Sequence, residues 1–87
     1  VAFLGWAGNH FAAGETFYLI VGSSAEGSAV TQWGLFQLAP HLETETQDAA
    51  DWLVIYDANI AGHPSRAFGS PDVYAPGFAV ARNRHAG

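Results

Sequence analysis

Side chains that could bind a metal ion are spread along the whole sequence. The four histidines include no pair at His-x-His, His-x3-His or Glu-x-x-His spacing; they are His10, His41, His63 and His85. Zinc sites usually show such short spacings. Oxygen ligands for calcium do gather within twelve residues, but they lack the alternating order and the turn glycine of a calcium loop; they are Asp48, Asp51, Asp57 and Asn59. We therefore expect no bound metal and no cofactor.

One carboxylate has neighbours that suggest acid catalysis. Glu15 precedes residues 31–38, which read Thr-Gln-Trp-Gly-Leu-Phe-Gln-Leu. Together these residues resemble the catalytic glutamate and the substrate-cleft strand of animal-type lysozymes and related peptidoglycan hydrolases. The resemblance implies that Glu15 is a general acid whose pKa is raised by an apolar pocket. However, Gln32 stands where a second carboxylate would be expected, and Glu15 precedes a strand-like run instead of ending a helix.

A second segment resembles part of another enzyme family. Residues 69–77 read Gly-Ser-Pro-Asp-Val-Tyr-Ala-Pro-Gly, similar to the stretch that precedes the nucleophile region of subtilases. No serine motif of that family follows in this chain, so the catalytic triad cannot be assembled here. A loop whose backbone angles are set by its prolines explains the same residues.

Aromatic residues make up 14% of the chain and include three tryptophans. Exposed aromatic rings in a small β-domain can stack on sugar rings, while nearby Asn and Asp side chains bind hydroxyl groups. Trp6, among glycines and Asn9, is the best candidate for an exposed ring. Trp33 and Trp52 lie inside apolar runs, so we expect them in the core. Glycan binding is therefore an alternative function.

The composition limits the classes of partner. A chain of 87 residues has room for one core, so we expect a single domain over 1–87. The chain has no lysine, three arginines and a net charge of −5, which argues against nucleic acid. Apolar residues reach 49% and charged residues only 13%, so part of the apolar surface should meet a protein partner or a second copy. No apolar run is long enough to span a membrane.

Two further features concern the compartment in which the protein works. The sequence has no cysteine, so disulfide bonds do not indicate a compartment. The chain begins at Val1 without an initiator methionine, as after removal of a signal segment. We therefore expect a secreted or surface-exposed protein.

Short apolar runs between glycine clusters predict strands rather than helices. The strongest is 16–21, Thr-Phe-Tyr-Leu-Ile-Val, which is apolar on both faces and should lie centrally in a sheet. Further strands are expected at 1–6, as an edge strand or frayed terminus, and at 31–38 and 78–82. A long loop is expected at 63–77.

The stretch 42–62 fits two structures. Ala49, Trp52, Leu53, Tyr56 and Ile60 form a helical stripe that predicts a helix over about 46–61. Residues 51–57, Asp-Trp-Leu-Val-Ile-Tyr-Asp, form an apolar run with a β-branched centre, which predicts a strand. The strand is slightly favoured.

These patterns predict an all-β or strongly β-biased fold, a small sandwich or barrel. The alternative is α+β with one helix over about 46–61. The expected core consists of Phe17, Leu19, Val21, Trp33, Leu35, Trp52, Val54 and Phe78.

The expected function is that of a non-enzymatic structural or protein-interaction subunit in a larger extracellular, envelope or virion assembly. A glycan-binding module and a lysozyme-like hydrolase fragment with Glu15 as its acid are the alternatives. The expected binding residues are Trp6, Phe68, Val73, Tyr74 and Phe78, because the aromatic and apolar side chains of 67–78 cannot all turn inward.

Overall fold

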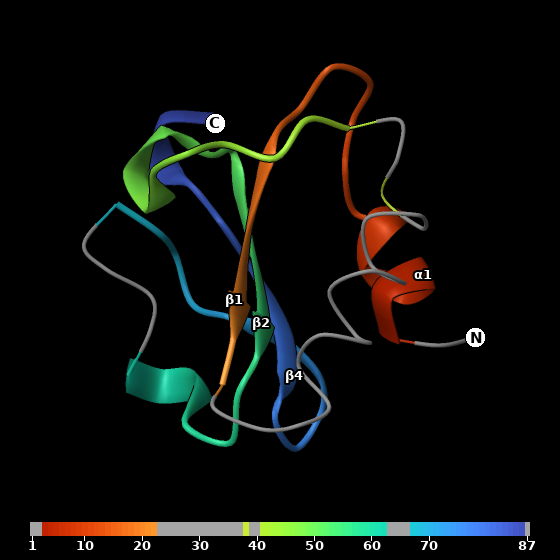
Figure 1. Ribbon diagram of the computed structural model, residues 1–87, viewed down its shortest axis with the longest axis vertical. Coiled ribbons are helices and arrows are strands. Elements are labelled where there is room, and N and C mark those ends of the chain that lie inside the picture. The colour runs from red at the N-terminus through yellow and green to blue at the C-terminus, as the bar shows by residue number, and fades with distance from the viewer. Residues whose placement is uncertain (1–2, 23–37, 39–40, 63–66, 87) are drawn as a thin grey trace.

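The computed structural model describes residues 3–22, 38, 41–62 and 67–86. Their main element is one mixed four-stranded sheet in the order β1-β2-β4-β3, in which β1 is parallel to β2 and the other pairs are antiparallel. The β-biased class is confirmed. The strands are β1 (Phe17–Val21), β2 (Trp52–Tyr56), β3 (Asp72–Ala75) and β4 (Phe78–Arg82). The helix α1 (Phe3–Gly8) lies beside the sheet, as Figure 1 shows, and short 3-10 turns occur at Gln47–Ala49, Ile60–Gly62 and Arg84–Ala86.

The strand predicted at 51–57 is confirmed, and the alternative helix over 46–61 is wrong. Strand β2 lies between β1 and β4, and its residues from Trp52 to Ile55 are all buried. Its two faces are covered by the two buried clusters of the fold, and a strand covered on both faces has a continuous apolar run instead of the one-sided stripe of a helix. The strand predicted at 78–82 is confirmed as β4.

The strand predicted at 16–21 is confirmed as β1, but it does not lie centrally. It is an outer strand of the described sheet, and only its first residue is fully buried. Its start is covered by residues 42–44: the Phe17 N–H donates to the Leu42 carbonyl at 3.0 Å, and the Thr44 N–H donates to the Phe17 carbonyl at 2.8 Å. The strand that is covered on both faces is β2 instead.

The N-terminal segment is a helix instead of the strand expected at 1–6. Phe3, Leu4 and Ala7 are buried, at the 0, +1 and +4 spacing of one helical face. An isolated helix of six residues is not stable in water, so packing against the sheet must hold it in place. A short apolar segment containing glycines shows little of that packing in its sequence. No helix within the described ranges is long and apolar enough to cross a membrane.

Strand β3 falls inside the loop expected at 63–77. It pairs with β4 through a turn in which Gly77 has a φ of 84°. That positive φ suits glycine, which has no Cβ to clash with the backbone. Residues 63–66 lie outside the described part, as does the strand expected at 31–38 apart from Leu38. The expected core residues Trp33 and Leu35 lie there too.

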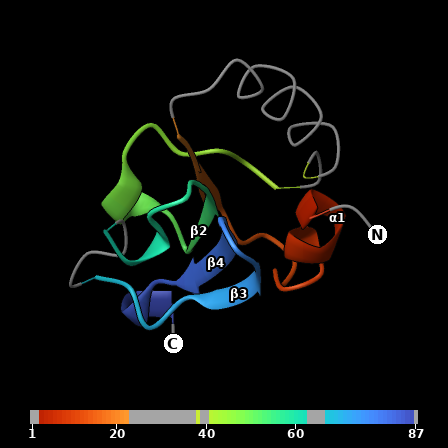
Figure 2. The ribbon, with the colours of Figure 1, turned by 90° about the horizontal axis from the view of Figure 1, so that it is seen from below.

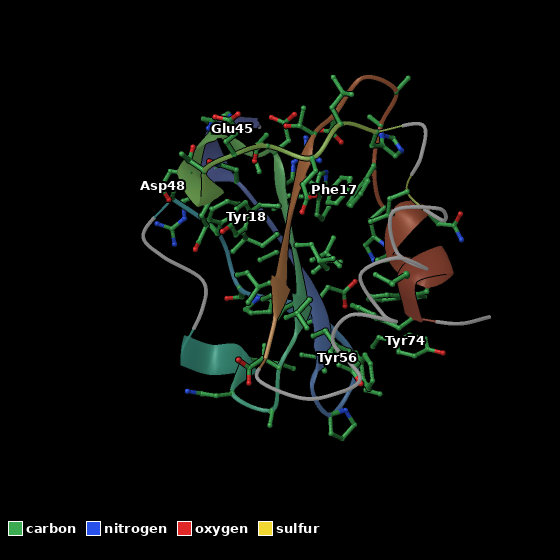
Figure 3. The ribbon with its side chains drawn as sticks, in the orientation of Figure 1. Phe17, Tyr18, Glu45, Asp48, Tyr56 and Tyr74 are labelled. Carbon is green, nitrogen blue, oxygen red and sulfur yellow. The ribbon has the colours of Figure 1, made fainter. Side chains whose placement is uncertain are left out.

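The sheet separates two apolar clusters. On the face covered by α1, Phe17, Trp52, Val54 and Val80 pack with the buried residues of the helix and with Leu38. On the opposite face, Leu53, Ile55, Ala79 and Ala81 pack with Phe68. Figure 3 shows Phe17 and Tyr18, neighbours in β1, pointing to these two sides. Of the other core predictions, Leu19 and Phe78 are partly buried against the α1-side cluster and Val21 is half-buried.

Candidate functional site

The α1 face of the sheet carries a group of aromatic rings next to β3. Phe3 and Trp6 come from α1, Tyr74 from β3 and Phe78 from β4. The ring centroids lie 5.0 Å apart for Phe3 and Phe78, 5.8 Å for Phe3 and Tyr74, and 5.0 Å for Trp6 and Tyr74. We call these four residues the ring patch. Figure 2 shows α1 to one side of the strands β2, β4 and β3, and the patch takes its rings from α1, β3 and β4.

The ring patch reaches the surface at Tyr74. That residue is 42% exposed, whereas Phe3 is 7% exposed. Trp6 and Phe78 have intermediate exposure. The patch therefore extends from the buried core of the domain to solvent, and three of the five predicted binding residues belong to it: Trp6, Tyr74 and Phe78.

The other two predicted binding residues lie elsewhere. Val73 precedes Tyr74 but pairs with Ala79, whose side chain belongs to the opposite face, and it is 53% exposed. Phe68 is 2% exposed, which contradicts its predicted role as a surface contact. A β-bridge between Phe68 and Asn83 places Phe68 over the sheet, where it packs against Leu53 and Ile55.

The outer edge of β3 is poorly suited to adding another strand. Pro71 and Pro76 flank the strand and have no N–H to donate, and the register with β4 shifts between Val73 and Ala75. Proline and bulges at a sheet edge both oppose strand addition. The side chains of Val73 and Tyr74, rather than the backbone of β3, therefore offer the contact surface.

A histidine links the end of α1 to β3 beside the ring patch. His10 Nε2 lies 2.8 Å from Asp72 Oδ2, and its Nδ1 lies 3.1 Å from the Trp6 carbonyl oxygen. The imidazole also contacts the Trp6 ring at 4.3 Å between centroids. The side chain of Asp72 is 63% exposed and that of His10 is 22% exposed, so a carboxylate lies open to solvent next to the exposed tyrosine.

Glu15, the catalytic candidate, is engaged in structural contacts. Its Oε1 accepts hydrogen bonds from the Ala12 N–H at 2.7 Å and from Trp52 Nε1 at 2.9 Å. Its Oε2 lies 3.2 Å from the Arg82 guanidinium, which also sits over the Trp52 ring at 5.2 Å. These contacts tie the loop after α1 to the first residue of β2 and the last residue of β4.

The predicted rise in the pKa of Glu15 is wrong. Burial by itself would raise the pKa of this carboxyl, but the hydrogen bonds from Ala12 and Trp52 and the charge of Arg82 outweigh it, so the pKa lies below its usual value. Glu15 is therefore ionised at neutral pH. A general acid must carry a proton, so this geometry does not favour the lysozyme-like role.

A second polar group lies at the same end of β2. Asp51 Oδ2 accepts hydrogen bonds from the Thr16 N–H at 2.9 Å and from the Thr16 hydroxyl at 3.2 Å, and its Oδ1 lies 3.2 Å from His85 Nε2. The Thr16 backbone hydrogen bond is the main cause that holds the pKa of Asp51 below its usual value; burial opposes it, while His85 and the Thr16 hydroxyl add to it. These contacts fasten β1 to β2 where both strands begin.

The described residues contain no group of three or more His, Asp or Glu side chains that could hold a metal ion. The acids that resembled calcium ligands serve local structure instead. Asp51 binds Thr16, and Asp57 Oδ1 accepts a hydrogen bond from the Asn59 N–H at 3.0 Å.

Sequence reasoning missed Phe3, His10, Asp72 and Arg82. His10 and Asp72 are 62 residues apart, and no spacing in the sequence marks their contact. Phe3 was assigned to a strand, so its packing partner Tyr74 was not foreseen. Residues 72–75 were expected to be part of a loop, so the position of Asp72 in an edge strand was not foreseen.

Comparison with known proteins finds no relative of this chain. No family model, no curated protein and no solved structure matches it.

Proposed function

We propose that this domain is a protein-interaction subunit that self-associates through the exposed edge of β3. The observation that carries the proposal is the pair Val73 and Tyr74, which are 53% and 42% exposed in consecutive positions of that strand. Exposed single apolar residues are common, but Tyr74 adjoins the partly exposed rings of Trp6 and Phe78 on the α1 face, and Val73 exposes a second apolar side chain on the opposite face of the same edge.

The composition supports the same proposal. Only 13% of the residues are charged, while 49% are apolar, so the domain has few side chains with which to keep such a surface solvated. Aromatic residues, tyrosine and tryptophan above all, are enriched at the centres of protein interfaces. The ring patch supplies both types on neighbouring elements.

The proposed partner is a second copy of the chain. A two-fold contact brings one surface against itself, so the same apolar side chains meet across the axis. The flanking prolines and the register shift of β3 direct this contact to side chains and away from a continuous intermolecular sheet. A different protein as the occupant is an outcome of the experiment that follows.

Light scattering over a range of micromolar concentrations tests the proposal. The expected result is a particle heavier than 9.2 kDa whose mass falls towards that of the monomer on dilution. Tyr74→Ser should weaken association about fivefold or more, because an aromatic anchor contributes about 1 kcal/mol or more to an interface. Leu42→Ser is the matched control: Leu42 is 75% exposed but lies on the β1 side of the sheet.

Three outcomes would count against self-association through β3. A strictly monomeric wild type is one, equal loss of association in both variants is another, and loss in Leu42→Ser alone is the third. A wild type that is monomeric but forms a stoichiometric complex with a different chain through Tyr74 would show that this surface binds that partner and not a second copy.

A second candidate function is glycan binding, which one group of contacts favours. The exposed Tyr74 ring lies 5.0 Å from the Trp6 ring, and the open Asp72 carboxylate precedes Tyr74 by two residues. An aromatic platform beside a carboxylate can stack on a sugar ring and bind its hydroxyl groups. A saturable shift of tryptophan fluorescence with saccharide, lost in Tyr74→Ser and Asp72→Asn, would support this function over self-association.

A further inference from the structure

His10 faces a hydrogen-bond acceptor with each of its ring nitrogens. Nδ1 lies 3.1 Å from the carbonyl oxygen of Trp6, and Nε2 lies 2.8 Å from the carboxylate of Asp72. A backbone carbonyl can only accept a hydrogen bond, and so can an ionised carboxylate. A neutral imidazole carries one N–H and can donate to just one of them, whereas the imidazolium donates to both.

The link joins α1 to β3, which are also connected by the contacts of the Phe3 and Trp6 rings with Tyr74. Helix α1 has six residues, too few to be stable by itself, and Asp72 lies in an outer strand. The helix has no titratable residue, so the charge at its end depends on His10. The apolar face of α1 provides the remaining packing through Phe3, Leu4 and Ala7.

We infer that His10 is a proton-dependent clasp that holds α1 against β3 and loosens the helix when it loses its proton. This inference goes beyond the proposed function and does not depend on it. Histidine is the side chain that most commonly gains and loses a proton near physiological pH.

The other groups around His10 leave Asp72 as its ionic partner. From α1 it meets the Trp6 ring and carbonyl, and from β2 it meets the Trp52 ring at 5.9 Å. Arg82 of β4 lies over that same Trp52 ring, and its charge faces the Glu15 carboxylate at 3.2 Å. Among the described residues these are the charged groups on the elements packed around His10.

Opening of the clasp has a defined structural consequence. Trp6 and Phe3 would move away from Tyr74 and Phe78, which separates the ring patch into its helix and strand halves. The buried side chains of α1 cover Val54 and Val80 of the sheet, so a loosened helix exposes apolar surface. Local opening of a weakly held element needs much less free energy than global unfolding.

Nuclear magnetic resonance tests the protonation directly. In ¹⁵N spectra at pH 5.5, both ring nitrogens of His10 should carry a proton while the backbone amides of α1 remain protected from exchange. A neutral His10 ring at pH 5.5 beside a fully protected helix would overturn the inference.

Hydrogen exchange tests the mechanical consequence. The amides of Asn9, His10 and Phe11 donate to the carbonyls of Trp6, Ala7 and Gly8, so they report opening of the end of the helix. After correction for intrinsic exchange, their protection should fall about two- to fivefold between pH 5.5 and 8.0, the size expected of a partly exposed ion pair. Asp72→Asn and His10→Gln should both abolish this fall.

His85→Gln is the matched control, because His85 forms the other described histidine–aspartate contact, with Asp51. This variant should keep the wild-type pH dependence at residues 9–11. Protection of the β2 amides serves as the reference for global stability, so a variant that merely unfolds is recognised. A flat wild-type profile, or an unchanged fall in Asp72→Asn, would refute the clasp.

Discussion

Trp52 Nε1 donates a hydrogen bond to Glu15 Oε1 at 2.9 Å, while Arg82 lies over the same indole ring and pairs with the other oxygen of the carboxylate. The indole is thus held by an acid at its edge and a cation on its face. This arrangement uses the carboxylate that most resembled a catalytic acid to fix the start of β2.

Replacing the indole tests this arrangement. Trp52→Phe keeps a buried ring but removes the donor, so the pKa of Glu15 should rise towards its usual value. The free energy of unfolding should fall by about 2 to 4 kcal/mol, from the lost hydrogen bond to a charged group and the smaller ring. Carboxyl ¹³C titration and urea unfolding measure the two effects. Trp6→Phe is the control, and an equal shift of Glu15 there would contradict the assignment.

Stability should depend on pH through Glu15 and Asp51. Both pKa values are lower in the folded protein than their ordinary values of 4.5 and 3.8, so the unfolded chain binds protons first as the pH falls. The contribution of these groups is complete near neutral pH and is lost below about pH 4.5. Chemical unfolding at pH 7, 4.5 and 3 should show this decline, and it should be smaller in Glu15→Gln/Asp51→Asn. Glu45→Gln, at an exposed acid, is the control variant.

Two leucines that differ in exposure should differ in how much they contribute to stability. Leu53 is completely buried in β2, and Leu42 is 75% exposed. Leu53→Ala should cost about 2 to 5 kcal/mol because it opens a cavity, enough to unfold much of a domain this small. Leu42→Ala should change stability by about 0.5 kcal/mol or less. Thermal melts followed by circular dichroism would show both, and similar melting temperatures for the two variants would contradict the described core.

The turn between β3 and β4 requires glycine. Gly77 has a φ of 84°, a backbone conformation that residues with a Cβ rarely adopt. Gly77→Ala should therefore destabilise the domain by about 1 to 2 kcal/mol. Gly69→Ala is the control, since Gly69 lies on the same side of β4 and does not have a positive φ. A Cβ added at Gly69 would lie 3.9 Å from its nearest neighbour, the Arg82 carbonyl oxygen. Equal unfolding midpoints in urea would show that the turn does not depend on Gly77.

The lowered pKa of Glu15 predicts the outcome of a lysis assay. If Glu15 serves structure, the wild-type domain should not clear a suspension of bacterial cell walls, and Glu15→Gln should behave identically. Turbidity measurements over several hours provide the comparison. Clearance by the wild type that disappears in Glu15→Gln would restore the hydrolase interpretation.

Much of the sheet could be predicted from the sequence, because its inner strands carry continuous apolar runs. Residues 52–56 and 78–82 form inner strands whose two faces are both covered by packed side chains, which accounts for their apolar runs. Strand β3 was missed because Asp72–Ala75 is a short, mostly exposed edge between prolines and resembles a loop. Helix α1 was missed because tertiary packing, not local propensity, makes Phe3–Gly8 helical.

The candidate site was predicted in part for a similar reason. Exposure of Val73 and Tyr74 followed from an excess of apolar side chains in one segment. The partners of Glu15 and His10 could not be predicted, because Trp52, Arg82 and Asp72 reach them only after the sheet has formed. Ion pairs between distant segments leave no periodic signal in a single sequence.

The mixed direction of the sheet has a consequence for how fast the chain folds. Strands β3 and β4 are joined by a tight turn, so their pairing closes a short loop and can form within microseconds. The parallel pairing of Phe17 with Trp52 joins residues that lie far apart in sequence. The chain must lose the conformational entropy of that long loop before the contacts of the pairing can stabilise it. We therefore expect the antiparallel half of the sheet to assemble first and the docking of β1 onto β2 to set the folding rate.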